Sequence, residues 1–102
     1  MLNTVAEFKR LMVRGLRLEL IGYTVNMLPK PHPNIGRVRC VVHVQTNEVC
    51  LADSMDAPRS NWGWMSWPKK GELFWEEGAR EFGVQKGTSR LTYKILPEPS
   101  NG

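Results

Sequence analysis

The sequence has no long apolar run and no leader-like N-terminus. No segment approaches the roughly 20 apolar residues that a membrane-spanning helix requires, so we expect no membrane association. The first fifteen residues mix acidic and basic side chains and lack the continuous apolar centre of a secretory signal. We therefore expect a cytoplasmic protein.

The chain also lacks the short motifs that mark common enzyme chemistries. It has no Gly-rich phosphate loop, no HExxH zinc motif and no GxSxG nucleophile turn. The glutamates between residues 72 and 81 are balanced by neighbouring Lys and Arg and have no histidine nearby, which indicates a charged surface. We predict no catalytic residue and no enzymatic activity.

Cysteine and histidine occur only twice each. Cys40 and Cys50 fall in neighbouring predicted strands, where a disulfide is geometrically conceivable. The lack of an export signal favours two reduced, buried thiols instead. No CxxC or HxxxH spacing links the cysteines with His32 and His43, so we predict no metal site and no cofactor.

The composition is that of one small globular domain. The 102 residues are 41% hydrophobic and 24% charged, and we place the domain at residues 1–96 with a flexible tail at 97–102. The net charge of +4 comes from the first half, where seven Lys or Arg face three Glu. That bias permits binding to nucleic acid or to an acidic protein but requires neither.

The apolar pattern predicts one helix followed by short strands. Thr4 and Glu7 fit a capping box, and Phe8, Leu11 and Met12 share one helical face, which predicts a helix over residues 4–14. Strands are predicted at residues 16–20, 37–45, 48–52, 62–67, 73–75 and 90–96.

Two segments have weaker patterns. Residues 26–36 hold three alternating prolines and are predicted to be a stiff loop, with a ligand for an SH3-type domain as the alternative. Residues 76–88 fit either a hairpin or a short helix. The whole order predicts a mainly β fold with one N-terminal helix, arranged as a small, SH3-like, partly open antiparallel barrel.

Strand 37–45 has two distinct faces in this prediction. Val38, Cys40, Val42 and Val44 form a stripe that we expect to be buried under the helix. The opposite face would carry Arg37, Arg39, Val41 and His43, either as a solvated outer surface or as a basic platform for phosphate or carboxylate groups.

All four tryptophans lie within residues 62–75. Alternation along strand 62–67 places Trp62 and Trp64 on one face and Trp67 on the other, so at least one indole is expected to face solvent. The cluster is either the core of a small domain or a recognition surface.

Several of these patterns together resemble a family of small uncharacterised proteins of actinobacterial phages and related mobile elements. The resemblance covers about half of the chain, and the most specific part is the W-x-x-W-P-K element at residues 64–69. The other matching segments are residues 4–10, 14–20, 37–51 and 91–95. Family members often have alanine where this chain has Lys70. The resemblance implies a phage or mobile-element origin and a helix-plus-barrel fold, and it supplies no catalytic residues.

These observations favour a binding module over an enzyme. We expect a phage-type protein that engages a host macromolecule, most simply a host protein that it blocks or redirects. The expected binding residues are Trp67, Lys69, Lys70, Arg37 and Arg39, because Trp and Arg anchor protein interfaces. The same side chains suit single-stranded nucleic acid, which is the first alternative. The second alternative is an accessory protein that forms a homodimer through an exposed strand edge.

Overall fold

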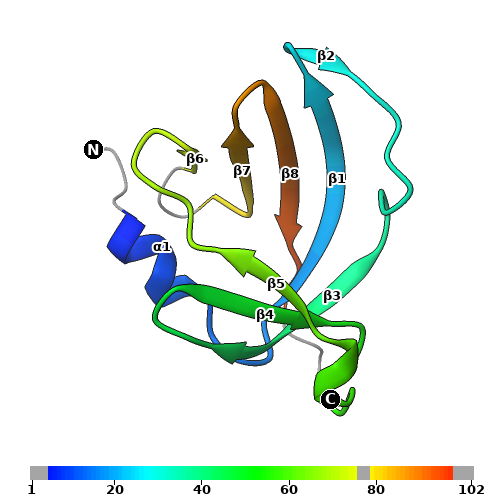
Figure 1. Cartoon of the computed structure of the whole chain (residues 1–102), viewed down its shortest axis with the longest axis vertical. Coiled ribbons are helices and arrows are strands. Elements are labelled where there is room, and N and C mark those ends of the chain that lie inside the picture. Colours follow the sequence, from blue (N-terminus) through cyan, green and yellow to red (C-terminus); the bar gives the residue numbers. More distant parts are fainter. Residues whose placement is uncertain (1–4, 76–78, 98–102) are drawn as a thin grey trace.

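The computed structural model describes residues 5–75 and 79–97 (Figure 1). The fold is mainly β, as predicted, with a single α-helix, α1 (Val5–Leu11), within the described ranges. The strands are β1 (Arg17–Val25), β2 (Leu28–Pro29), β3 (Val38–Val44), β4 (Glu48–Ala52), β5 (Gly63–Ser66), β6 (Leu73–Phe74), β7 (Glu81–Lys86) and β8 (Ser89–Ile95). A short 3-10 turn, Arg59–Asn61, precedes β5.

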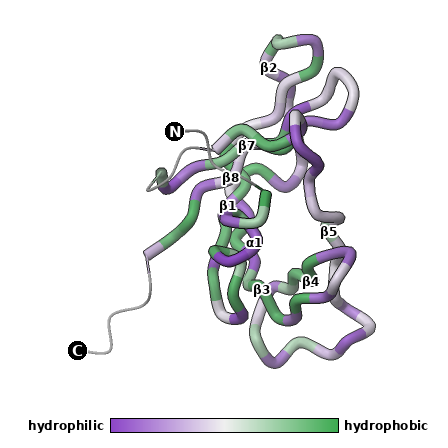
Figure 2. The backbone as a smooth tube through the Cα atoms, turned by 90° about the vertical axis from the view of Figure 1, so that its left-hand side faces the viewer, coloured by the Kyte–Doolittle hydropathy of each residue, from purple (hydrophilic) through white to green (hydrophobic). Residues whose placement is uncertain are grey.

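The strands form one antiparallel sheet in the order β5-β4-β3-β1-β8-β7-β6, with β2 paired to the end of β1. The sheet is strongly bent, so β3, β4 and β5 cross beneath β1, β7 and β8 (Figure 1). The end strands β5 and β6 are not paired with each other in the described sheet, which therefore remains open. Figure 2 shows β5 on the opposite side of the bent sheet from β1 and β8.

The main core lies between the bent sheet and α1. Phe8 is fully buried, and its ring meets those of Phe82, Trp75 and Trp67 at centroid distances of 4.8, 5.9 and 6.5 Å. All three contacts are edge-to-face, which is the favoured geometry for aromatic pairs. The other buried members are Met12, Leu18, Val41, Val49, Leu51, Val84 and Ile95.

The helix is shorter than the predicted residues 4–14. It ends at Leu11, although the Met12 amide still donates to the Phe8 carbonyl at 3.2 Å. Gly15 then adopts φ +98° and donates its N–H to the Val41 carbonyl of β3. The backbone has thus left the helix by Gly15, whose N–H pairs with the sheet. The predicted cap at Thr4 lies outside the described residues.

Strand β1 extends beyond its predicted end at residue 20. The pairing register with β8 shifts between Leu20 and Gly22, as at a β-bulge, and the strand continues to Val25. Residues 28 and 29, predicted as loop, pair back onto it. In the segment 76–88, for which a hairpin and a short helix were both considered, residues 81–86 form β7, one arm of a hairpin with β8. Residues 76–78 lie outside the described residues.

Cys40 and Val42 lie on one face of β3 and Val41 on the other, as predicted, but the burial expected of the two faces is wrong. Cys40, Val41 and Val42 are all buried: Val41 lies in the main core, whereas the other two join Cys50 and Ala52 in a second cluster. A register shift between Val41 and His43 interrupts the alternation of side chains. The strand is therefore sandwiched between two apolar clusters.

We also expected the helix to pack against Val44 and Trp64, and this is wrong, because the two side chains are 41% and 50% exposed. Strand β4 has its predicted bounds. At the end of the chain, the Pro97 carbonyl accepts a hydrogen bond from Arg17 Nη2 at 2.8 Å, and the rest of the predicted tail lies outside the described residues.

Candidate binding groove

Trp67, the indole expected to bind a partner, is partly buried in the core. Its ring packs against Phe8, its Nε1–H donates to the Gln45 carbonyl at 2.9 Å, and Lys9 Nζ lies 5.4 Å from the ring centroid. The following Pro68 is fully buried. Among the described tryptophans it is Trp64, on the opposite face of the strand, that is most exposed.

Lys69 and Lys70 lie in the tight turn between β5 and β6. The Lys69 N–H donates to Glu72 Oε1 and its carbonyl accepts from the Glu72 N–H, both at 2.9 Å. That backbone N–H is the main reason that the pKa of Glu72 is lowered. Gly71, at φ +92°, allows the turn. Both lysines remain exposed.

Arg37 forms a two-pronged ion pair with Asp53. Its Nε donates to Oδ1 at 2.9 Å and its Nη2 donates to Oδ2 at 2.8 Å, which ties the start of β3 to the end of β4. The hydrogen bonds from Arg37 lower the pKa of Asp53, and the same pair raises the pKa of the guanidinium.

Arg39 lies in an apolar hollow inside the bend of the sheet, not on an outer face. We call this hollow, together with the one adjoining it, the basic groove. The first hollow, of about 210 Å³, is lined by Leu18, Leu20, His32, Asn34, Arg37, Arg39, Leu51, Leu91 and Tyr93. The second, of about 300 Å³, is lined by Tyr23, His32, Trp64, Met65, Ser66, Val84, Lys86, Ser89, Leu91 and Tyr93. His32, Leu91 and Tyr93 line both hollows and so join them.

The electrostatics of the basic groove are one-sided. No Asp or Glu is among the described residues that line either hollow. Arg39 has no hydrogen-bond or ion-pair acceptor in the described ranges, although its charge, after the contacts from Arg37, contributes to the lowered pKa of the Asp53 carboxyl. It has room beside β5 because Gly63 lacks a side chain. A Cβ at Gly63 would lie 3.1 Å from Arg39 Nη1. Burial raises the pKa of the Tyr93 phenol, and the charge of Arg39 acts in the opposite direction.

The proline-rich loop brings His32 to the groove. Pro31 and Pro33 flank it and restrict the backbone on both sides. The imidazole meets the Tyr23 ring edge-on at 5.1 Å, and its Nδ1 accepts the Asn34 N–H at 3.1 Å. In a neutral imidazole with this bond, the proton is therefore on Nε2.

Strand β5 borders the groove and has a free edge, since β4 is its only partner among the described strands. Met65 points to the core side, whereas Trp64 points to the other side, where its ring is 6.5 Å from that of Trp62. The Trp62 ring stacks on His43 at 6.1 Å, and its Nε1–H donates to the Ala57 carbonyl. The edge thus lies between the apolar groove and an exposed aromatic cluster, and Trp64 borders both.

The structure therefore divides the predicted binding residues. Arg37 and Arg39 lie at the groove, near the Gly63 end of β5, whereas Trp67, Lys69 and Lys70 follow its other end. Sequence reasoning missed Tyr93, Leu91 and His32, which come from distant segments. Alternation did place Trp64 opposite Trp67, but it did not indicate which face is the core.

The described residues contain no group of three His, Cys, Asp or Glu side chains that could hold a metal ion. Cys40 and Cys50 are free and buried, as expected. In the same ranges no helix is both long and apolar enough to cross a bilayer. Comparison with known proteins adds no family to this picture: no family model, curated protein or solved structure matches the chain.

Proposed function

We propose that the chain is a small phage-type binding module that engages a host protein in the cytoplasm and catalyses no reaction. One observation carries the proposal: the free edge of β5 opens onto an apolar groove that holds an unpaired Arg39 and is lined by no carboxylate in the described part of the chain. The proposal also describes the fold as a small, SH3-like, partly open barrel.

The partner that fits this surface is an extended, acidic and apolar segment. Such a segment can add to the β5 edge through main-chain hydrogen bonds, which provide affinity without sequence preference. Its side chains alternate between the two faces, so one set enters the groove beside Met65 and the other contacts Trp64. A carboxylate near the Gly63 end would pair with Arg39, which gives the segment its charge preference.

The test is selection from a displayed library of short extended peptides, followed by calorimetry on the enriched sequences. The proposal expects enrichment of acidic residues next to apolar ones, and affinity about tenfold lower for Arg39→Gln. Arg10→Gln, an exposed cation on α1, is the matched control and should bind as the native chain does. Enrichment without an acidic residue, or equal affinity of the Arg39 variant, would contradict it.

Binding to nucleic acid is the second candidate, because the same groove is positive and contains aromatic side chains. It predicts a mobility shift with single-stranded DNA or RNA and an affinity that falls steeply as salt rises. Nuclease treatment before affinity purification from the host, followed by mass spectrometry, separates the two. A protein captured equally with and without nuclease favours the first candidate.

Self-association through β5 is the third candidate, since a second copy can pair with the same free edge. It predicts a dimer in light scattering at micromolar concentration. The Trp67 N–H donates to the Asn47 carbonyl, so alternate residues of β5 face β4 and the N–H of Ser66 points to the free edge. Proline at Ser66 would remove that N–H and should abolish the dimer.

A further inference from the structure

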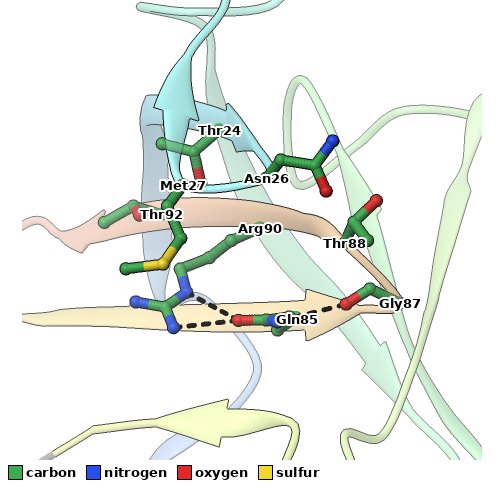
Figure 3. Close-up of a pocket in the computed structure, with 8 residues that line it drawn as sticks. All are labelled: Thr24, Asn26, Met27, Gln85, Gly87, Thr88, Arg90 and Thr92. Atoms are coloured by element: carbon green, nitrogen blue, oxygen red, sulfur yellow. Dashed lines mark hydrogen bonds between the residues drawn. The ribbon is translucent and has the colours of Figure 1, made fainter.

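A third hollow, which we call the outer hollow, lies on the outer face of the sheet, on the other side of β8 from the basic groove. It has a volume of about 540 Å³ and is lined by Thr24, Asn26, Met27, Gln85, Gly87, Thr88, Arg90 and Thr92 (Figure 3). Three of these residues carry hydroxyl groups, one is an arginine, and none of the lining residues in the described chain is acidic. The hollow is therefore positive, like the basic groove, but it is more polar.

The guanidinium of Arg90 is held in a fixed position. Its Nε and Nη2 both donate to Gln85 Oε1, at 3.1 and 2.9 Å, and Gln85 Nε2 donates in turn to the Gly87 carbonyl at 3.1 Å (Figure 3). Its central carbon also lies 3.8 Å from the ring centroid of Phe74. Arg90 Nη1 has no acceptor among the described residues, so donors remain for a ligand.

Gly83 makes this position possible. Arg90 crosses β7 above this glycine to reach Phe74, and a Cβ at Gly83 would lie only 3.3 Å from Arg90 Cδ. An arginine fixed on both sides loses less side-chain entropy when it binds an anion than a free surface arginine does. These contacts, which we call the Arg90 clamp, therefore hold the guanidinium in position for binding.

The rim of the hollow is a strained turn. Asn26 and Met27 both have positive φ, 52° and 67°, although neither is glycine. The left-handed region is uncommon for methionine in particular, and such residues concentrate at functional sites. The Asn26 N–H donates to the Thr88 carbonyl at 2.9 Å, which fixes the turn to the β7–β8 hairpin. Met27, 91% exposed, extends from this turn beside Arg90 (Figure 3).

We propose that this hollow binds the phosphate group of a small phosphorylated sugar. Arg90 would receive the phosphate, because its planar donors match phosphate oxygens. The hydroxyls of Thr24, Thr88 and Thr92 and the amide of Asn26 would bind the sugar hydroxyls. The volume suits a ligand of that size. This site is independent of the proposed protein-binding groove and faces the opposite side of β8.

The test is an amide-resolved NMR titration of the full chain with ribose 5-phosphate, up to about 10 mM. Saturable shifts are expected at residues around Arg90 and the turn at Asn26. Arg90→Gln should weaken binding about tenfold or more, and Thr92→Val, which removes only a hydroxyl, several-fold. Lys94→Gln is the matched control: it removes one charge from the same strand and the same face, outside the hollow.

Four outcomes would overturn the proposal. These are the absence of saturable binding, an equal loss in the Lys94 variant, binding of ribose as tight as that of ribose 5-phosphate, and binding of a single-stranded oligonucleotide but not of the sugar phosphate. Near-UV circular dichroism of each variant shows whether it is folded. If Arg90→Gln does not fold, unchanged affinity in Thr92→Val would by itself contradict the assignment.

Discussion

Replacing Phe8 with alanine should remove a large part of the stability of this domain. The side chain is fully buried and is the aromatic centre that joins α1 to Phe82, Trp75 and Trp67. Truncating a buried phenylalanine costs about 3–5 kcal/mol through lost transfer energy and the cavity that remains. Each edge-to-face pair adds roughly 0.5–1.5 kcal/mol beyond its area, and the 4.8 Å pair with Phe82 is the closest of the three. We therefore expect the upper half of that range.

The size of the domain makes such a loss decisive. A chain of this length has about 5–15 kcal/mol of stability in total, so the variant should lose between about a quarter and nearly all of it. Each kcal/mol corresponds to roughly 4–8 °C in Tm for a domain near this size, which predicts a fall of more than about 15 °C. Urea unfolding followed by tryptophan fluorescence measures the change directly.

Two controls make the result specific. Phe8→Leu keeps an apolar side chain and should cost about half as much or less, because it loses the ring pairs but leaves a smaller cavity. Val13→Ala, at a side chain that is 55% exposed beyond the same helix, should change stability by no more than about 0.5 kcal/mol. A cost below about 1 kcal/mol for Phe8→Ala would refute the packing of α1 on the sheet.

Three further predictions follow from single contacts. Asp53 has a folded pKa below its reference of 3.8, so its pair with Arg37 stabilises the fold above about pH 4 and is lost as the pH falls through the folded pKa. The Tm curves of Asp53→Asn and the native chain should therefore converge as the pH falls below the folded pKa, and a constant gap would contradict this. Gly83→Ala should change stability by less than about 1 kcal/mol but lower the affinity for ribose 5-phosphate, because its Cβ displaces Arg90; a native affinity would refute the clamp. Burial raises the pKa of the Cys50 thiol, so it should react with Ellman's reagent only after denaturation, and immediate reaction of the folded chain would be the contrary result.

Local patterns correctly predicted the features that depend on only a few neighbouring residues. Strand β4 has the bounds predicted for it, and the alternation along β5 correctly separated Trp64 from Trp67. Phe8 was identified as a core residue by helical spacing alone. In each case the signal is contained within a few residues, where steric and hydrogen-bonding preferences act.

The remaining features depend on packing between distant segments. Nothing local shows that both sides of β3 are covered, so its stripe of valines was assigned to the wrong cluster. Local alternation shows that Trp64 and Trp67 lie on opposite faces, but which of them meets Phe8 depends on how β5 lies against the helix. The groove was invisible for the same reason, since Arg39 and Tyr93 belong to strands far apart in the sequence.

Strand β8 serves two surfaces with four consecutive side chains. Leu91 and Tyr93 line the groove, whereas Arg90 and Thr92 line the outer hollow. Because side chains alternate strictly, inserting or deleting one residue here would exchange the two sets and put a charge where the interior is apolar. Length changes should therefore be excluded from β8 in natural or engineered variants, while the exposed loop that follows β4 has room to vary in length.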